Sequence, residues 1–232
     1  MQKLCFSIDC EYVAEPIVCR NGSLLGVEVL TRFSTRGMLE GKLDAAKFII
    51  GMKVDSKRQL LLSQLHEIKN QAAFFLRSGL VCSINIDFDM AGIILKNQQV
   101  IALLNVLPFV RLEISENFPN LSDGIRNPLL KTLGGLYHLW LDDLGAGNSN
   151  MEAVQAGCFE CVKIDKNFFW EHGHSRMFPI LIRKLSLYTK QIIVEGVESE
   201  QQLKRLKQHP ITGTQGYLNK AVPLCEMQTL LQ

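Results

Sequence analysis

The amino-acid sequence predicts an α/β fold, a modified TIM (β/α)8 barrel in which the first strand runs antiparallel to the second. From residue 81 onward, short apolar runs alternate with segments of helical periodicity, which is typical of parallel strands joined by helices. Eight strand-like runs in a chain of 232 residues favour closure into a barrel. An open doubly wound sheet is the main rival. Such sheets usually carry a Gly-rich phosphate loop, and neither a GxGxxG nor a GxxxxGK(S/T) pattern occurs in the sequence.

The first two strands are expected at Tyr12 to Cys19 and at Leu24 to Thr31. The Asn-Gly dipeptide at positions 21–22 lies between them and is the strongest short signal for a hairpin, so we expect the two strands to pair antiparallel. The region from Leu43 to Ser78 then places apolar side chains at helical spacing among charged ones. This pattern predicts two helices that are broken near Asp55.

The rest of the sequence repeats a strand followed by a helix. The expected strands are Val81 to Ile86, Phe109 to Ile114, Leu136 to Leu141, Phe159 to Ile164, Gln191 to Val194 and Ile211 to Gly216. The expected helices are Met90 to Asn105, Pro128 to Leu133, Met151 to Ala156, Ser175 to Thr189 and Ser199 to Gln208. A last helix, Leu224 to Leu231, is expected to cover the outside of the barrel.

Composition and charge indicate one domain without a polymeric partner. No Pro-, Gly- or Ser-rich stretch divides residues 1–232, so a single domain is expected. The formal net charge of +2 is too small to suggest a nucleic-acid track or an anionic membrane surface. The longest apolar run, 102–110, contains Asn105 and Pro108 and is too short to span a membrane. The first residues lack the apolar length of a secretion signal, so we expect a cytoplasmic protein.

The cysteines indicate no disulfide framework. There are seven of them, without scaffold-like spacing, so reduced thiols are expected. Cys158 and Cys161 form a lone CxxC pair, whereas a structural zinc site would need a second pair that the sequence lacks. We therefore prefer to interpret them as small buried hydrophobic residues, over metal binding or redox chemistry.

Six acidic residues stand where short apolar runs end: Glu28, Glu113, Asp142, Asp143, Asp165 and Glu195. A parallel barrel gathers the ends of its strands on one face, so these side chains are expected to form one cluster. Carboxylates crowded in a partly desolvated pocket take up protons or bind divalent cations, and hard oxygen ligands suit Mg²⁺ or Mn²⁺. Asn85, after another apolar run, would add a carbonyl oxygen. The sequence therefore predicts a metal-dependent enzyme.

The neighbouring acids Asp142 and Asp143 are the centre of this prediction. Two glycines that follow them, Gly145 and Gly147, would permit a sharp turn that brings both carboxylates into one pocket. Two cations held there, about 3.5 to 4 Å apart, would deprotonate a water and neutralise charge on a phosphoryl group. A polar turn with a helix cap is the simpler alternative for these residues taken alone. No Ser/His/Asp set stands out, so covalent acyl transfer is not expected.

Five more polar residues have both a functional and a structural interpretation: Arg32, Glu116, Lys163, Glu198 and Gln215. Lys163 would orient an anionic oxygen, or would form a salt bridge with Asp165 on the same strand face. Arg32 would bind a phosphate or pair with an acid. Glu116 would lie in a loop over the pocket or face water. Glu198 and Gln215 would join the pocket. Otherwise Glu198 would be a solvated helix residue and Gln215 a loop amide.

These residues lie in short motifs that follow one another along the chain: EVL with Glu28 and Leu30, then Arg32; SINI with Asn85; LEISE with Glu113 and Glu116; DDLGAG with Asp142 and Asp143; VKIDK with Lys163 and Asp165; VEGVE with Glu195 and Glu198; and QGYL with Gln215. Together they resemble the EAL-domain family of cyclic di-GMP phosphodiesterases over essentially the full length. The chain is similar to a stand-alone, single-domain member of that family.

The resemblance implies hydrolysis of cyclic di-GMP to linear pGpG with two Mg²⁺ or Mn²⁺ ions. The implied metal ligands are Glu28, Asn85, Glu113 and Asp142 for one ion, and Asp142, Asp143 and Glu195 at the second. Glu195, Lys163 and Gln215 would activate and orient water, and Glu116 would fasten the loop after the fifth strand, which in the family also joins a homodimer contact. The implied substrate-binding residues are Leu30, Arg32, Asp165 and Glu198.

The same loop departs from the family's usual DDFGTGYSS pattern. Leu144 replaces Phe, Ala146 replaces Thr and Asn148 replaces Tyr, and Asp87 stands at a position that is commonly Ser. Loss of the Thr hydroxyl and of two aromatic rings would loosen the loop, and so weaken the second metal or the dimer. No implied metal ligand is lost.

Three functions remain open at this point. The first is an active cyclic di-GMP phosphodiesterase, and the second is a degenerate member that binds a protein, for example a transcriptional regulator of motility or adhesion. The altered loop and the absence of a sensor or cyclase domain favour the second. The intact acids favour the first, because a binding protein has no need of a charge cluster that is costly to hold without cations. The third is a metal-dependent phosphodiesterase for another nucleotide. The enzyme is the preferred hypothesis.

Overall fold

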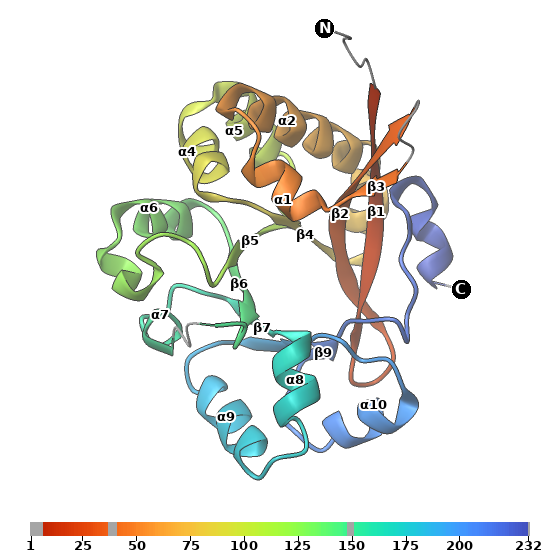
Figure 1. Ribbon diagram of the computed structural model, residues 1–232, viewed down its shortest axis with the longest axis vertical. Coiled ribbons are helices and arrows are strands. Elements are labelled where there is room, and N and C mark those ends of the chain that lie inside the picture. Colours follow the sequence, from red (N-terminus) through yellow and green to blue (C-terminus); the bar gives the residue numbers. More distant parts are fainter. Residues whose placement is uncertain (1–6, 37–40, 148–150, 232) are drawn as a thin grey trace, which may run out of the picture.

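The computed structural model describes residues 7–36, 41–147 and 151–231, and Figure 1 shows a closed barrel surrounded by helices. Its strands, in sequence order, are β1 (Ser7–Cys19), β2 (Leu24–Arg36), β4 (Val81–Asn85), β5 (Val110–Ser115), β6 (Leu139–Leu144), β7 (Cys161–Ile164), β8 (Gln191–Val194) and β9 (Gly213–Thr214). Around the barrel the order is β1-β9-β8-β7-β6-β5-β4-β2, and the pairing of β1 with β2 closes the ring. The predicted modified TIM barrel is confirmed.

The reversed first strand is confirmed as well. β1 runs antiparallel to both of its barrel neighbours, β2 and β9, whereas the pairs from β2 through β4 to β9 are parallel. The hairpin turn uses the predicted Asn-Gly pair: the Asn21 side chain accepts a hydrogen bond from the Ser23 amide at 3.0 Å, and Gly22 has a φ of 89°. Two short strands, β3 (Gly41–Leu43) and β10 (Val222–Pro223), pair with β2 and β1 outside the ring.

Close approach of β2 to β4 depends on Gly26. A Cβ atom at this position would overlap the backbone carbonyl oxygen of Val81, with which Gly26 is in register. Only hydrogen fits between the two strands here, because backbone atoms have no freedom to move aside. The metal-ligand candidate Glu28 follows two residues later on β2, so this contact helps to fix its position.

The helices lie outside the barrel (Figure 1). They are α1 (Ala45–Ile50), α2 (Val54–Asn70), α3 (Ala72–Ser78), α4 (Phe88–Lys96), α5 (Gln98–Asn105), α6 (Pro128–Leu136), α7 (Met151–Gln155), α8 (Lys166–His172), α9 (Met177–Leu185) and α10 (Glu200–Leu206), with 3₁₀ segments η1 (Leu121–Arg126) and η2 (Leu224–Leu231). None of the helices in the described ranges has the length and apolar character needed to cross a membrane.

Several predicted boundaries were wrong. Residues 45–78 form three helices, since the chain breaks again at Gln71, and the single helix expected from Met90 is divided at Asn97. The Asn97 side chain caps α5 by accepting hydrogen bonds from the amides of Gln99 and Val100, both at 3.1 Å. This local bond competes with continuation of the helix. The last segment, η2, is 3₁₀ rather than α-helical.

A small apolar cluster closes the barrel interior beneath the acidic residues. It consists of Ile17, Trp140, Cys161 and Ile193, all with no exposed surface. Trp140 and Cys161 each lie two residues before a polar side chain of the site on the same strand, and residues two apart on a strand share a face. Ile193 lies two residues before Glu195, which directly follows β8. We call this cluster the apolar floor. It also accounts for Cys161, which is a buried, unpaired thiol as predicted.

Candidate functional site

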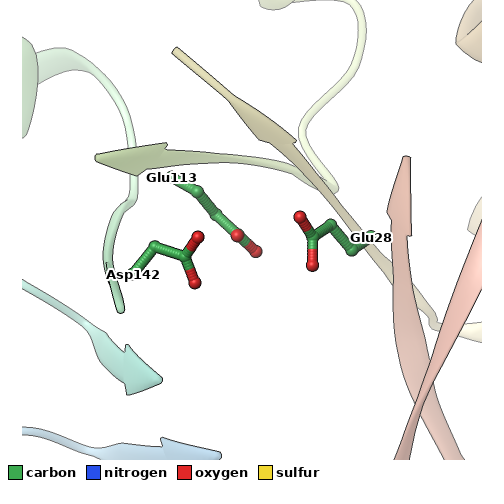
Figure 2. A group of neighbouring side chains, drawn as sticks. All are labelled: Glu28, Glu113 and Asp142. Carbon is green, nitrogen blue, oxygen red and sulfur yellow. The ribbon is translucent and has the colours of Figure 1, made fainter. Parts of the chain in front are cut away.

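Carboxylates from distant parts of the chain meet at one end of the barrel. Figure 2 shows Glu28 of β2, Glu113 of β5 and Asp142 of β6 with their carboxylate groups directed toward one another. Their nearest oxygens lie within 4.8 Å of each other, as do those of a second group formed by Asp142, Asp143 and Glu195. Asp142 belongs to both groups, so the predicted cluster exists and has two adjoining halves.

A buried ammonium group occupies the middle of this cluster. The Nζ atom of Lys163, on β7, lies 2.7 Å from Glu28, 2.9 Å from Glu113, 3.0 Å from Asp142 and 2.7 Å from Glu195. The Lys163 side chain is 0% exposed. One internal cation is therefore shared by four carboxylates, which is a stronger role than either of the two expected from the sequence.

Asp165 does not share the strand face of Lys163, and that expectation was wrong. β7 ends at Ile164, and Asp165 caps α8 by accepting a hydrogen bond from the Phe168 amide at 2.9 Å. A carboxylate at a helix N-terminus is held by the amide and by the helix dipole. The side chain is nevertheless buried, and it lines the cavity beside the cluster that is described below.

Asp143 has an unusual backbone conformation that places it beside Asp142. Its φ is 58°, in the left-handed region, and the β6–β7 register shifts between Leu141 and Leu144. A bulge of this kind lets consecutive residues point to one side of a strand. The turn expected at the glycines is present at Gly145, whose φ is 103°, but the left-handed conformation begins already at Asp143 itself. Aspartate is one of the few residues that tolerate this region.

Two amide side chains hold Glu28 in place. Asn85 Nδ2 donates to one carboxylate oxygen of Glu28 at 2.5 Å, and Gln215 Nε2 donates to the other at 2.7 Å. The second oxygen of Glu113 and the carbonyl oxygen of Gln215 are buried without a hydrogen-bond partner. Buried oxygens of this kind are uncommon unless a ligand satisfies them. Rotation of the Asn85 amide would also present its oxygen to the same space.

Burial sets the protonation of the cluster. Desolvation, followed by the charge of neighbouring carboxylates, raises the pKa of Glu113 well above its ordinary value and that of Asp143 to about 6. Desolvation also raises the pKa of Glu195 well above its ordinary value. Burial acts against Glu28 too, but the Lys163 ammonium and three hydrogen bonds hold its pKa below the ordinary value. These carboxylates and the Asn85 amide are oxygen ligands of the kind that divalent cations prefer. A bound cation would also favour the ionised form of carboxyl groups whose mutual repulsion otherwise raises their pKa.

A cavity of about 680 Å³ opens beside the cluster. Its wall includes the four residues that the sequence predicts for substrate binding: Leu30, Arg32, Asp165 and Glu198. Glu116 lies away from it and accepts a hydrogen bond from the Gly147 amide at 3.2 Å, which joins it to the loop after β6. The altered position 148 in that loop falls outside the described residues.

Glu15 of β1 is a site residue that the sequence reasoning missed. It is paired in register with Glu28 across the β1–β2 hairpin, is half-buried and lines the cavity. Burial, followed by the charge of Glu28, raises the pKa of its carboxyl group. Its signal was that it is the one acid in the otherwise apolar run from Tyr12 to Cys19, next to Pro16. Like Glu28 on β2, Glu15 lies inside its strand rather than at the end of it.

Asp87 has a structural role in this protein. Its side chain caps α4 by accepting a hydrogen bond from the Met90 amide at 2.9 Å. It also pairs with the buried Nζ atom of Lys57 at 2.5 Å, and Asp89 pairs with the same atom at 2.7 Å. The aspartate that departs from the usual Ser therefore ties α4 to α2, and this contact is separate from the acidic cluster.

Comparison with known proteins identifies the family. The family model described as EAL domain matches residues 8–220. The chain belongs to the EAL domain family. The resemblance stated from its motifs is confirmed by this match over nearly the whole chain.

The EAL-domain relatives include two kinds of protein. YdiV of Escherichia coli is 32% identical over 97% of this chain and 95% of its own, and the anti-FlhC(2)FlhD(4) factor YdiV of Salmonella arizonae is 24% identical over 94% and 93%. The cyclic di-GMP phosphodiesterase PdeH of E. coli is 26% identical over 99% and 91%. The crystal structure of the EAL-like domain protein YdiV has a TM-score of 0.87 at 31% identity, over 98% and 97% of the two chains.

Proposed function

We propose that this EAL-domain protein is a regulator that acts by binding a protein partner, and that the partner is a complex of the FlhC(2)FlhD(4) type. The observation that carries the proposal is the nearly full-length similarity to YdiV in both sequence and structure. This reverses the preference for an enzyme that the acidic residues alone suggested. The reason for that preference was the cost of holding the carboxylates without external cations.

The position of Lys163 removes much of that cost. Its ammonium group contacts Glu28, Glu113, Asp142 and Glu195 within 3.0 Å, so the fold supplies one cation of its own. The raised pKa of Glu113 and of Glu195 favours retention of protons, which reduces the remaining negative charge. An intact cluster is thus compatible with a protein that never turns over a nucleotide.

The cavity wall also supports this proposal. Six acidic residues line it, Glu15, Glu28, Asp143, Asp165, Glu195 and Glu198, against three basic ones, Arg32, Lys166 and Lys220. Even when Glu15 and Glu195, whose pKa values are raised, keep their protons, four acidic residues remain against three basic ones. An excess of negative charge repels a phosphodiester, which is itself anionic. Without divalent cations in place, a cyclic dinucleotide would therefore bind weakly here.

A direct binding measurement tests the proposal. Purified protein is titrated into the purified FlhC(2)FlhD(4) complex by isothermal titration calorimetry, with EDTA present so that no metal-dependent reaction contributes. We expect saturable binding in EDTA that is unchanged by Glu28→Gln, because this variant disables the cluster while the exterior stays the same. Absence of binding by the unaltered protein would contradict the proposal.

A cyclic di-GMP phosphodiesterase is the second candidate, favoured by the convergence of every residue that the sequence predicts as a metal ligand. Glu28, Asn85, Glu113 and Asp142 would hold one Mg²⁺ or Mn²⁺ ion, and Asp142, Asp143 and Glu195 a second. Bound cations would lower the pKa of a water and neutralise phosphoryl charge. The buried, unpartnered oxygen of Glu113 supports a ligand at this place.

The roles of the other residues follow from their positions. Glu195, at the edge of the second group, would accept a proton from the attacking water. Lys163 and Gln215 would orient that water, and Arg32 on the cavity wall would hold a phosphate oxygen. A homodimer through the loop after β6 remains a prediction, which light scattering would test.

Turnover assays decide between the candidates. Cyclic di-GMP is incubated with the protein in Mn²⁺ or Mg²⁺, with and without EDTA, and pGpG is followed by chromatography. Appearance of pGpG that is abolished by EDTA and by Asp143→Ala would establish the enzyme. A parallel panel of other cyclic nucleotides tests whether a different phosphodiester is the substrate.

A further inference from the structure

The outer face of α9 carries an exposed apolar stripe. Met177, Ile180 and Leu187 are 66%, 55% and 76% exposed. Helical hydrogen bonding continues past the end of α9, since the Leu187 amide donates to the Lys184 carbonyl at 3.2 Å. With Lys184, these residues lie at spacings of three, four and three, which is the seam spacing of a helix that packs against another helix. We call them the α9 seam.

The opposite face of α9 is fully used by the fold. Phe178, Ile182 and Leu185 are buried, and the Phe178 ring packs at 5.8 Å from the ring of Phe169 on α8. The helix is therefore anchored by one face and presents the other to solvent on the outside of the barrel (Figure 1). Since the inward face is already satisfied, packing of the barrel does not explain the apolar residues of the seam.

Positive charge borders the seam. Segment 176–190 contains Arg176, Arg183, Lys184 and Lys190 and no acidic residue, although the whole chain has a net charge of only +2. Arg176 and Arg183 stand seven residues apart, each directly before a seam position, so they form one edge of the stripe. Charges at such flanking positions select the charge of a partner helix.

The other exposed large apolar side chains do not form a comparable surface. Several lie on different elements, for example Leu76 on α3, Phe88 on α4 and Ile125 on η1, while Trp170 and Tyr217 belong to the lining of the cavity already described. Single exposed apolar residues are ordinary on protein surfaces, whereas a contiguous set indicates an interaction site. The α9 seam is distinguished by its regular spacing and by its uniform charge.

We propose that the α9 seam binds an amphipathic helix of a partner protein, whose apolar residues pack on Met177, Ile180 and Leu187 and whose acidic residues pair with Arg176 and Arg183. The inference rests on the proposed protein-binding function and assigns a surface to it. A protein helix fits better than a lipid surface, because the apolar stripe has the width of a coiled-coil seam and Lys184 lies within it. Helices that lie on membranes have a broad apolar face.

The test uses the FlhC(2)FlhD(4) complex as the probe and compares matched variants. Ile180→Ser with Leu187→Ser removes two exposed seam residues, and Leu76→Ser with Val106→Ser removes two residues that are 58% and 56% exposed on other elements. Because all four side chains are exposed, both double variants are expected to keep the Tm of the unaltered protein. The seam variant should raise the Kd about tenfold or more, and the control should leave it unchanged.

A charge variant tests the second half of the proposal. Arg176→Glu with Arg183→Glu should weaken binding about three- to tenfold, mainly through slower association, and should reduce the salt dependence of the association rate. Equal reversal of two exposed lysines elsewhere, Lys42→Glu with Lys131→Glu, serves as the control and should have little effect.

Each outcome has a distinct meaning. If the unaltered protein binds the complex and the seam variants bind equally well, the α9 seam is not the interface and the proposed function still stands. If the unaltered protein does not bind, the proposed function fails and this inference fails with it. Vesicles of phosphatidylserine and phosphatidylcholine are tested in parallel. If the seam variants lose binding to vesicles but keep binding to the complex, while the controls keep both, the seam is a membrane surface and the proposal is overturned.

Discussion

Replacement of Lys163 by methionine tests whether the internal ammonium group balances the acidic cluster. Methionine fills a similar volume without charge, so Lys163→Met leaves three buried carboxylates and the half-buried Glu195 without their shared cation. Removal of one partner from a buried ion pair costs about 3 to 5 kcal/mol. Proton uptake by carboxyl groups whose pKa is already raised, such as Glu113, offsets part of this loss. We therefore expect the lower half of that range.

Thermal unfolding in EDTA at pH 7 measures this cost. For a chain of 232 residues, each kcal/mol shifts the Tm by about 2 to 4 °C, so the expected decrease is about 6 to 16 °C. Lys166→Met is the matched control, since Lys166 is exposed and lies three residues further along the chain. Added Mn²⁺ should raise the Tm of Lys163→Met more than that of the unaltered protein, because an external cation then replaces the lost charge.

A Tm of Lys163→Met in EDTA equal to that of Lys166→Met would refute this reasoning. It would mean that protons alone neutralise the cluster, and that the four short contacts contribute little to the free energy of unfolding. A smaller Mn²⁺ effect in Lys163→Met than in the unaltered protein would show instead that Lys163 helps to assemble the cation site, as the phosphodiesterase hypothesis requires.

Three other changes have expected outcomes. In EDTA, the free energy of unfolding should fall as the pH rises from about 4 to above 6. The reason is that the pKa of Asp143 is raised to about 6 in the folded state, so ionisation of this carboxyl group penalises folding. Urea denaturation at several pH values measures this, and a free energy of unfolding that stays constant over the range would contradict the prediction. Gly26→Ala should cost about 1 to 3 kcal/mol, since its Cβ meets the Val81 carbonyl, and an unchanged urea midpoint would disprove that contact. Asp87→Ser should lower the free energy of unfolding by about 1 to 3 kcal/mol, because it removes one partner of Lys57. Cyclic di-GMP turnover, if present, should stay the same. Loss of turnover at unchanged stability would place Asp87 in the site.

The barrel could be predicted from the sequence because its signals are local. The Asn-Gly turn specifies an antiparallel hairpin, and the alternation of apolar runs with helical segments specifies parallel strands. Boundaries were less predictable where a side chain decides between two continuations. Asp165 was interpreted as part of a strand, although it caps α8, and α8 was consequently missed. Asn97 divides a helix in the same way.

The members of the candidate site other than Glu15 could be named from the sequence, but not their mutual contacts. Acids at strand ends are visible in the sequence, and the barrel brings them together by its topology. The four contacts of Lys163 depend on the lengths and rotamers of side chains on four strands and of Glu195, which follows β8; no local pattern encodes them. The left-handed conformation of Asp143 and the inward position of Glu15 likewise follow from strand register. Register was the part of the fold for which the sequence held no direct signal.

The apolar floor lies at the end of the barrel interior that faces away from the cavity. Since Ile17, Trp140, Cys161 and Ile193 fill the barrel beyond the carboxylates, the cavity mouth is the approach that the described structure offers a molecule bound there. Entry of a second molecule must therefore wait until the first has left. A large partner seated over that mouth would stop exchange altogether, trapping whatever was inside at the moment of docking.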